Sequence, residues 1–464
     1  MVVLQFGIQV VLARLLGPEQ YGLFALGLVA VTLSNFLALS FVYGLIQKRN
    51  LTDDDLRFVN LWQLTIGAGV AAAVYLLADG VAGFFREARL APLMEAMAIV
   101  CILQALAGIP ATLLTRELDF KWLYCANTSS YALAYGMVGI PLAVAGYGVR
   151  ALVVALIAQN VLSLAVLYWR KPPRLGLLLW HRDAGAFCRY AATVFATNLS
   201  NWALQNVGRA NVGRLFPSAA VGLYALAYNL AMQLAQAVNG AVQQTLFSAS
   251  SRMQDELPRQ RRVFLTMLAA TALLLVPMFA GMAAVPHTIT LAFYGDAWAD
   301  SAPLLRAFAL GVPFHIFTAM ATPMLWTSGR TTQEYKLLLP MVLALAFATF
   351  LAAQHSLTAA AWAACIIFAL RCLVMIIAAC RALGLGAGEV AGAVRAGIAV
   401  SALVAAAVAL VDTLLVQLTH EFAVVLACDV STGFVTQLAA LRLFRPWFST
   451  EALGLMEKLI ALQL

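Results

Sequence analysis

A thirteen-residue stretch near the start of the chain, Arg14-Leu15-Leu16-Gly17-Pro18-Glu19-Gln20-Tyr21-Gly22-Leu23-Phe24-Ala25-Leu26, returns two hundred positions later as Arg214-Leu215-Phe216-Pro217-Ser218-Ala219-Ala220-Val221-Gly222-Leu223-Tyr224-Ala225-Leu226. The arginine, the glycine in ninth place and four apolar residues recur in register, and Phe24 is matched by Tyr224. Each copy joins the end of one apolar segment to the start of the next. Internal duplication of an apolar chain is typical of transporters, so the repeat predicts a carrier built from two related halves.

The composition indicates a membrane protein. Of the 464 residues, 63% are hydrophobic and 11% are charged, whereas about 25% of the residues in an ordinary soluble domain are charged. A water-facing surface cannot be built from so few polar side chains. The sequence therefore predicts an all-α polytopic membrane protein.

Apolar runs between charged or turn-forming breaks predict about fourteen helices. Six helices separate the two copies of the repeat, so both halves begin in the same orientation and the repeats are parallel. About 13 residues precede Arg14, which is short for a span, and we expect the first helix to continue upstream of Met1. The predicted spans are 1–14, 20–45, 58–78, 93–115, 122–145, 149–169, 186–213, 219–249, 264–285, 301–326, 337–353, 357–380, 392–411 and 421–441.

The positions of the cations predict the orientation, because cytoplasmic loops retain Lys and Arg. If the N-terminus is cytoplasmic, twenty of the 29 Lys and Arg fall in inside loops and five in outside segments. An even number of helices then places both termini in the cytoplasm. The same bias explains the net charge of +8 through topology and anionic headgroups, without a nucleic-acid partner.

Four parts of the chain follow from the repeat and the charges. We expect an N-terminal six-helix lobe over 1–169, with its first helix truncated, and a basic cytoplasmic linker over 170–185. A second six-helix lobe is predicted over 186–380. Two extra transmembrane helices and a cytoplasmic tail are predicted over 381–464.

Four stretches together resemble the Wzx-type polysaccharide (O-antigen) flippases, in the polysaccharide transporter family of the MATE-like MOP superfamily. The repeat from Leu12 to Gly22 resembles the opening of these proteins, and 116–121 resembles their basic loop after the fourth helix. The other two stretches are 209–228 and 293–305. The chain departs from its relatives at the curtailed first helix and at Gly208, where relatives often carry an acid before the arginine.

The resemblance implies a MATE-like fold of two six-helix bundles around a central cavity, with two extra C-terminal helices. It also implies a transporter, not an enzyme, in the bacterial inner membrane. Its cargo would be an undecaprenyl-diphosphate-linked oligosaccharide repeat unit, passed to the periplasmic leaflet by alternating access for exopolysaccharide or lipopolysaccharide biosynthesis. Implied partners are membrane lipids, a polymerase, chain-length or export machinery and a coupling proton or sodium ion. No cofactor or metal is implied.

Three arginines within predicted spans are candidate substrate-binding residues: Arg209 on the seventh, Arg306 about one turn inside the tenth and Arg371 near the middle of the twelfth. A charge at mid-membrane costs at least ~2.5 kcal/mol on insertion scales, so each one requires a reason. A guanidinium stays charged and offers phosphate a planar fork, which suits a diphosphate. Snorkelling or pairing with an acid explains the same residues without a ligand.

Titratable groups that could couple transport to an ion are few. Glu95 lies near the outer end of the fourth helix, His315 on the tenth and Asp429 halfway along the fourteenth. Protonation or sodium binding changes the charge of a buried carboxylate, whereas a lone histidine is also a common packing residue. Asp412 lies at a helix end, and no role is predicted for it.

Polar uncharged side chains are concentrated on the seventh and eighth helices. Gln236, Asn239 and Gln243 are spaced three and four residues apart, so they lie on one helical face. Such side chains must face other helices or water in a membrane, so they form either a wet face for sugar hydroxyls or interhelical hydrogen bonds.

The sequence is also compatible with other functions. A drug or cation antiporter and a lipid II flippase share the implied fold, although an arginine-biased interior disfavours cationic cargo. A membrane polysaccharide polymerase or glycosyltransferase usually needs a long outer loop or an acidic motif. Here the longest predicted outer segment, about 286–300, carries only Asp296 and Asp300. The sequence shows neither a phosphate-binding Gly-rich loop nor a metal-ligand cluster.

Overall fold

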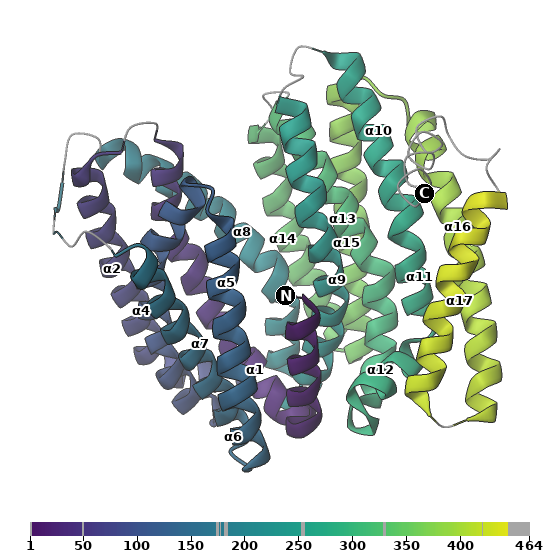
Figure 1. Ribbon diagram of the computed structural model, residues 1–464, viewed down its shortest axis with the longest axis horizontal. Coiled ribbons are helices and arrows are strands. Elements are labelled where there is room, and N and C mark those ends of the chain that lie inside the picture. The colour runs from purple at the N-terminus through teal and green to yellow at the C-terminus, as the bar shows by residue number, and fades with distance from the viewer. Residues whose placement is uncertain are drawn as a thin grey trace. The chain divides into compact units, whose positions relative to one another are not determined.

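The computed structural model describes residues 2–48, 51–172, 176, 178–180, 184–251, 256–327, 331–419 and 421–443. These residues form helices, with no strand among them, in two compact units (Figure 1). The first unit is Met1–Gly222 and the second is Leu223–Leu464, so the boundary lies within one helix. Within the described residues, ten helices are long and apolar enough to cross a membrane. The predicted all-α polytopic fold is confirmed.

The first unit is built around one long, kinked helix. α1 (Val2–Gln47) packs against α2 (Asp53–Leu76), α4 (Leu90–Arg116) and α8 (Ala184–Leu215). Gly17 breaks α1 with φ 71° and ψ 175°, directly before Pro18. This backbone region is essentially restricted to glycine, so the first copy of the repeat separates two helices as predicted. The remaining elements are α3 (Ala78–Phe85), α5 (Phe120–Tyr131), the π-helix η1 (Ala132–Gly139), α6 (Ile140–Val144) and α7 (Val149–Arg170).

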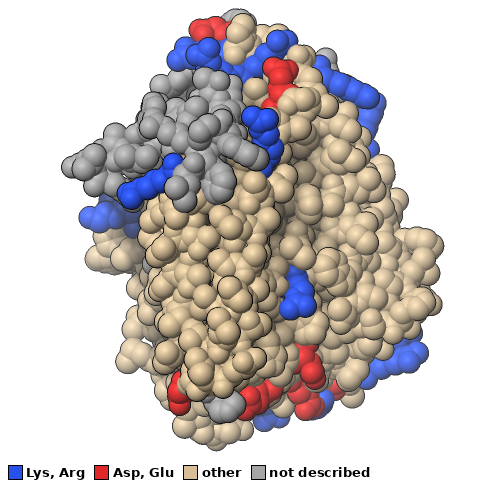
Figure 2. Space-filling model, turned by 90° about the vertical axis from the view of Figure 1, so that its right-hand side faces the viewer, with Lys and Arg blue, Asp and Glu red and all other residues tan. Residues whose placement is uncertain are grey.

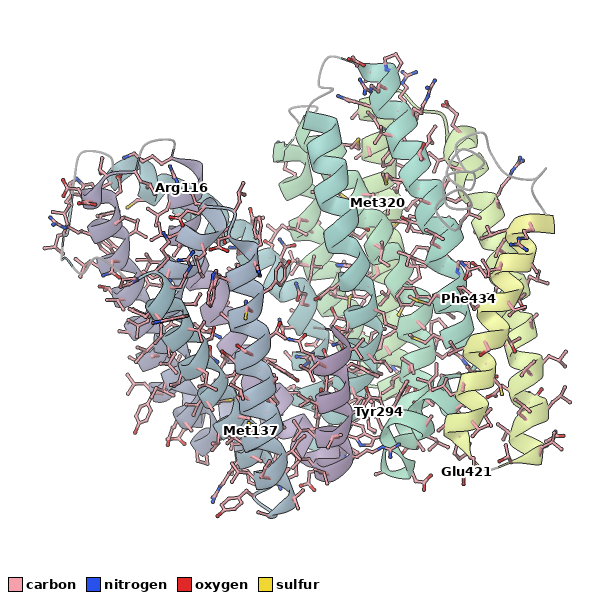
Figure 3. All side chains as sticks on the ribbon, in the orientation of Figure 1. Arg116, Met137, Tyr294, Met320, Glu421 and Phe434 are labelled. Carbon is pink, nitrogen blue, oxygen red and sulfur yellow. The ribbon has the colours of Figure 1, made fainter. Side chains whose placement is uncertain are left out.

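A polar network joins the ends of three helices in the first unit. Thr52 and Asp55 form a capping box that starts α2, and the Asp55 carboxylate accepts a hydrogen bond from Lys48 Nζ at 2.7 Å. Arg116, labelled in Figure 3, donates to the backbone oxygens of Leu45 at 2.6 Å and Lys48 at 2.5 Å. Because α1, α2 and α4 end here, the network fixes their common end at the predicted cytoplasmic side.

The two copies of the repeat cross each other through their matched glycines. A Cβ added to Gly22 would overlap the Ser218 carbonyl oxygen, and one added to Gly222 would overlap the Pro18 carbonyl oxygen. Pro18 and Ser218 are themselves matched positions, so the contact has the reciprocal form of an isologous interface. Glycine at both places lets the two backbones touch, as small residues do in close helix packing.

The second unit begins in α9 (Ser218–Ser251) and contains a tightly packed pair, α13 (Ala302–Thr327) and α15 (Leu357–Leu383). Gly311 faces Cys365, and the Cys365 thiol donates to the Ala307 carbonyl oxygen at 3.0 Å. α14 (Thr331–Ala353) packs beside α15, and α16 (Ala387–Leu418) packs against α10 (Leu257–Leu274), α11 (Val276–Ala284) and α17 (Phe422–Leu443).

The outer segment predicted over 286–300 is not an extended loop. α12 (Pro286–Tyr294) and the 3-10 helix η2 (Asp296–Ser301) occupy it, and the Trp298 side chain within it is completely buried. Pro286 favours a helix start because its missing N–H would be unsatisfied there in any case. The apolar face of this short helix packs on α13 and α17, a tertiary contact that sequence periodicity alone did not reveal.

Charged side chains gather at the ends of the second unit. Figure 2 shows the face that carries α16 and α17, where a broad and mostly uncharged belt, with a Lys or Arg group visible within it, separates charged groups at the two ends. This is the pattern of a bilayer-spanning surface.

The boundary between the compact units differs from the linker expected over 170–185. α8 belongs to the first unit, where Gly213 packs against Leu26 and Phe85. Arg174 and Arg182 of the expected linker, and residues 444–464 of the expected tail, lie outside the described residues. The two six-helix lobes stay a prediction from the repeat.

Candidate functional site

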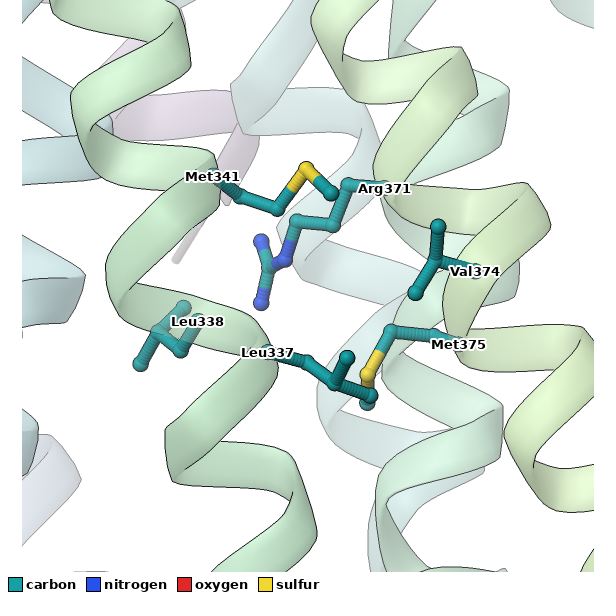
Figure 4. A pocket seen from close by; sticks show the side chains of 6 residues that line it. All are labelled: Leu337, Leu338, Met341, Arg371, Val374 and Met375. Carbon is teal, nitrogen blue, oxygen red and sulfur yellow. The ribbon is translucent and has the colours of Figure 1, made fainter.

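Arg371 places a permanent positive charge in the middle of an apolar helix of the second unit. It lies in α15 and lines a shallow cleft between α14 and α15 together with Leu337, Leu338, Met341, Val374 and Met375. Its guanidinium extends across this cleft toward α14 (Figure 4). The other five lining side chains are apolar. A cation with an apolar flank is the arrangement that a phosphate on a lipid chain requires.

His315 lies beside Arg371, across the interface of α13 and α15. Its ring centroid is 6.0 Å from that of Phe368, which precedes Arg371 by one helical turn, and it interacts electrostatically with Arg371. The close approach of Gly311 and Cys365 holds these two helices together. The structure therefore brings together one predicted substrate residue and one predicted coupling residue.

Arg306 lies apart from this cleft. Its side chain is exposed near the start of α13, and its Nε donates to the Ala283 carbonyl oxygen at 3.2 Å. Ala283 is in the last turn of α11, where backbone oxygens have no partner within the helix. Arg306 therefore has a structural contact, and its predicted role in substrate binding stays a prediction.

Arg209 is buried in the first unit, with 8% of its surface exposed. Its matched position in the first copy is Gln9, whose side-chain amide donates to the Tyr21 hydroxyl at 2.7 Å. The second copy has Val221 where the first has Tyr21. The repeat thus replaces a neutral amide–phenol pair with an arginine, so Arg209 is not needed for the architecture that the two copies share.

The predicted coupling acids occupy different environments. Glu95 is exposed on α4, whereas Asp429 is buried on α17 with 2% of its surface exposed. Asp429 lies beside Asp412 of α16, a residue to which the sequence assigned no role. No pattern along the chain could have paired them, because seventeen residues and a helix reversal separate the two positions.

The polar face predicted on α9 is described in part. Gln236 is exposed. The side chains of Asn239 and Gln243 lie outside the described residues. On α8, the polar side chains contact α1: Trp202 Nε1 donates to the Val29 carbonyl oxygen at 3.2 Å, and Asn198 to Ser40 Oγ at 3.5 Å. For these two residues the structure supports interhelical hydrogen bonding.

A tyrosine cluster in the first unit was missed from the sequence. The rings of Tyr131 and Tyr135 stack at 4.6 Å between centroids, and both side chains interact electrostatically with Tyr21 of α1. Tyr135 lies in the π-helix η1, a distortion that is frequent at functional sites. The sequence feature that could have predicted this cluster is the spacing of four residues between the two tyrosines, which places them on one face of a helix.

The described part of the chain contains no candidate metal-binding cluster. There, no group of three or more His, Cys, Asp and Glu side chains converges closely enough to hold an ion.

The fold and the charges within its apolar helices define a polytopic α-helical membrane protein. Residues 11–303 match the family described as "Polysaccharide biosynthesis protein". This match covers more than half of the chain, so the chain belongs to that family.

Curated relatives agree with the family. The chain is 24% identical over 300 residues to the lipopolysaccharide biosynthesis protein WzxC of Escherichia coli (strain K12), covering 64% of this chain and 61% of the relative. It is 25% identical over 306 residues to the succinoglycan biosynthesis transport protein ExoT of Rhizobium meliloti (strain 1021), covering 65% and 61%. The match thus spans about three-fifths of the length of these relatives.

Solved structures confirm the MATE-like fold. A lipid II flippase MurJ in an inward closed conformation superposes with a TM-score of 0.75 at 14% identity, covering 96% of this chain and 97% of that one. An inward-facing multidrug resistance MATE family transporter of the MOP superfamily gives a TM-score of 0.61 at 13% identity, covering 83% and 95%. At these identities the likeness shows the fold alone.

Proposed function

We propose that this protein is a flippase that moves an undecaprenyl-diphosphate-linked oligosaccharide repeat unit from the cytoplasmic to the periplasmic leaflet of the bacterial inner membrane. Family membership supports a step in polysaccharide biosynthesis, and the names of WzxC and ExoT point to the same process. The fold supports transport between two lobes by alternating access, with no chemical reaction. Both termini are cytoplasmic in this proposal.

Arg371 is the observation that carries the proposal. The cargo has an anionic diphosphate, a polar saccharide and an apolar tail. Arg371 offers a guanidinium at membrane depth beside an apolar cleft, and arginine binds phosphate oxygens through charge-assisted hydrogen bonds. Arg209 provides a second guanidinium, which is buried in the first unit. Fixed cations of this kind disfavour cationic cargo, which is the reason to place a drug or cation antiporter second.

A complementation assay tests the proposal. The gene is expressed in a bacterium that lacks its own flippase but makes the matching lipid-linked repeat unit, and surface polysaccharide is measured with the pool of units in the cytoplasmic leaflet. Restored export is the expected result for the wild-type protein. Arg371→Ala should lower export by about tenfold or more, because a hydrogen bond to a charged group contributes about 1.5–3 kcal/mol, and repeat units should accumulate inside.

Arg381→Ala is the matched control, because Arg381 is exposed in the last turn of the same helix. It should leave export unchanged. Full export by Arg371→Ala would remove Arg371 from the mechanism. Expulsion of cationic dyes without any export of polysaccharide precursors would instead establish the antiporter.

A lipid II flippase is the other candidate on this fold, since MurJ superposes over nearly the whole chain. Both cargoes present a diphosphate on a lipid, so the arginines suit either one. Rescue of a strain depleted of its lipid II flippase, without rescue of polysaccharide export, would establish this alternative.

Export also requires partners. A polymerase and chain-length or export machinery would receive the flipped units, and membrane lipids would surround the transporter.

A further inference from the structure

The second unit contains a pair of carboxyl groups at membrane depth, on the two helices that follow the duplicated part of the chain. Asp412 lies on α16 and Asp429 on α17, and these helices pack along each other. Asp412 is six residues from the end of α16 and Asp429 seven from the start of α17. Both therefore lie about 10 Å inside the ends of their helices. Figure 3 labels Glu421, which marks that end of the unit, and Phe434 further along α17.

The two carboxyl groups face each other in a largely dry environment. Asp429 is 2% exposed, whereas Asp412 is half-buried, and the two side chains interact directly. Neither oxygen of Asp429 receives a hydrogen bond from the described residues. Asp412 already accepts one from the hydroxyl of Thr288 on α12, a side chain that is 1% exposed. One acid is thus held in place by a buried donor, while the other is aimed at it with both oxygens available.

This arrangement requires a positive charge between the two acids. Two ionised carboxylates side by side in an apolar interior repel each other and lose their hydration. Carboxylates are acceptors only, so they cannot hydrogen-bond to each other without a proton. A bound proton turns one of them into a donor, and a sodium ion would instead be coordinated by oxygens of both.

Among the described residues of the elements packed here, no cationic side chain lies next to the two acids to supply that charge. α11 carries no titratable side chain. His287 on α12 is exposed, and its ring packs on Phe422. Cys428 and Tyr294 are uncharged thiol and phenol groups. The remaining titratable side chains lie toward the helix ends: Glu421, Glu389, Arg395, Arg442, Arg259, Arg261 and Arg262. Arg442 and Arg395 lie thirteen and seventeen residues along the helices from Asp429 and Asp412, which is about 20 Å or more.

We propose that Asp412 and Asp429, together with the hydroxyl of Thr288, form an intramembrane binding site for one monovalent cation, either a proton or a sodium ion. When a proton binds, one carboxyl group carries it and donates a hydrogen bond to the other carboxylate, which stays ionised. The half-buried side of Asp412 gives the cation its access. This site does not depend on the identity of the transported lipid, so the cation-site proposal can be tested separately from the proposed function.

Infrared difference spectroscopy of the purified full-length protein in phosphatidylethanolamine–phosphatidylglycerol vesicles tests the proposal. In sodium-free buffer at neutral pH, the wild-type protein should show the carbonyl band of a protonated carboxyl group. Asp429→Asn should abolish this band, because the remaining Asp412 is half-exposed and has Thr288 as a donor. Asp412→Asn should shift the band, since the hydrogen-bond partner changes. Glu421→Gln, exposed at the same end of α17, is the matched control and should leave the band unchanged.

Sodium addition distinguishes the two cations. Loss of the protonated band on adding sodium shows that sodium displaces the proton, and a band that persists shows a site for protons; both outcomes support the proposal. A sodium-induced change in carboxylate bands that requires Asp429 also supports it. The proposal is overturned if the wild-type protein shows neither a protonated carboxyl band nor a sodium-induced change in its carboxylate bands. This measurement needs only the wild-type protein, so a poorly folded variant cannot obscure it.

Discussion

The two copies of the repeat build the same crossing with different accessory contacts. Both contribute a glycine to the backbone contact of Gly22 and Gly222. The first copy adds polar contacts of its own: Gln9 donates to Tyr21, and the Gln20 side chain accepts a hydrogen bond from the Val149 N–H at the start of α7. The second copy has Arg209, Val221 and Ala220 at the matched positions. Matched glycines therefore maintain the shared crossing, whereas the unmatched residues differ in their contacts between the two copies.

Arg14 and Arg214 refine this comparison, because the same residue type is used at the same place. Arg214 donates to the Phe84 carbonyl oxygen at 2.8 Å and lies over the Phe84 ring at 5.2 Å. Arg14 is exposed. A matched arginine at a helix end is thus accounted for by local contacts, in contrast to the buried Arg209.

The largest effect is expected from breaking the crossing itself. Gly222→Leu would drive a side chain into the Pro18 carbonyl, and neither backbone can move without shifting a helix. We expect a loss of about 3 kcal/mol or more, seen as loss of the monodisperse protein in size-exclusion chromatography and a lower Tm in detergent. Gly69→Leu, on an exposed face of α2 with open space around it, is the control. A wild-type Tm for Gly222→Leu would contradict the close contact.

A smaller loss is expected from the feature that only the first copy has. Gly17 adopts φ 71° and ψ 175°, whereas the second copy carries Pro217 at that position. Gly17→Ala forces a β-carbon into this backbone region at a cost of about 2 kcal/mol, which a thermal unfolding curve would detect. Gly7→Ala, within the helical part of α1 and with open space around it, should be neutral or stabilising. Equal Tm values for both variants would show that the break does not need glycine.

Exchanging the unmatched arginine should affect transport rather than folding. Arg209→Gln installs the residue type of the first copy, so the shared architecture should survive. We expect polysaccharide export to fall by about tenfold, as for the loss of one charge-assisted hydrogen bond, with an unchanged Tm. Arg214→Gln should lower stability slightly and leave export intact. The reverse pattern, with export sensitive at Arg214 and insensitive at Arg209, would invert the roles assigned to matched and unmatched residues.

The smallest effect is expected from the short segment 87–89, whose charged side chains contact both copies of the repeat. Arg89 pairs with Glu19 of the first copy at 2.7 Å and with Glu87 at 2.8 Å, and Glu87 also interacts with Ser218 of the second copy. The hydrogen bond from Arg89 holds the pKa of Glu87 below its ordinary value of 4.5. A lowered pKa in the folded state stabilises the protein above that ordinary value, and the contribution is lost as the pH falls through the lowered pKa.

Glu87→Gln should therefore lower the stability at pH 7 by about 0.5 kcal/mol, since Arg89 is half-exposed and solvent screens the pair. The difference in Tm between wild type and variant should shrink as the pH falls below 4.5. Asp300→Asn, which alters an exposed carboxylate in the second unit, should give no such pH-dependent difference. A constant difference down to acidic pH would indicate that Glu87 acts through packing and not through its charge.

The sequence by itself determined the class of fold, the positions of most helices and the kinship of the two repeats. Hydropathy and breaking residues act along the chain, so 149–169 and 357–380 were located within a few residues of α7 and α15. The helix hidden in 286–300 was missed, because its apolar face is short and its partners, α13 and α17, lie elsewhere in the chain.

Only the tertiary structure decided which of the buried polar groups meet. The sequence identified Arg371, His315 and Asp429 as unusual, because a charge or an imidazole within an apolar span is unusual wherever the helix turns. It could not show that His315 lies within electrostatic range of Arg371 or that Asp412 is the partner of Asp429. Those pairings depend on the rotation of each helix about its axis and on its packing neighbour. Close contacts such as that of Gly311 with Cys365 determine the rotation of a helix and its packing neighbour. These contacts join residues that are far apart in the chain.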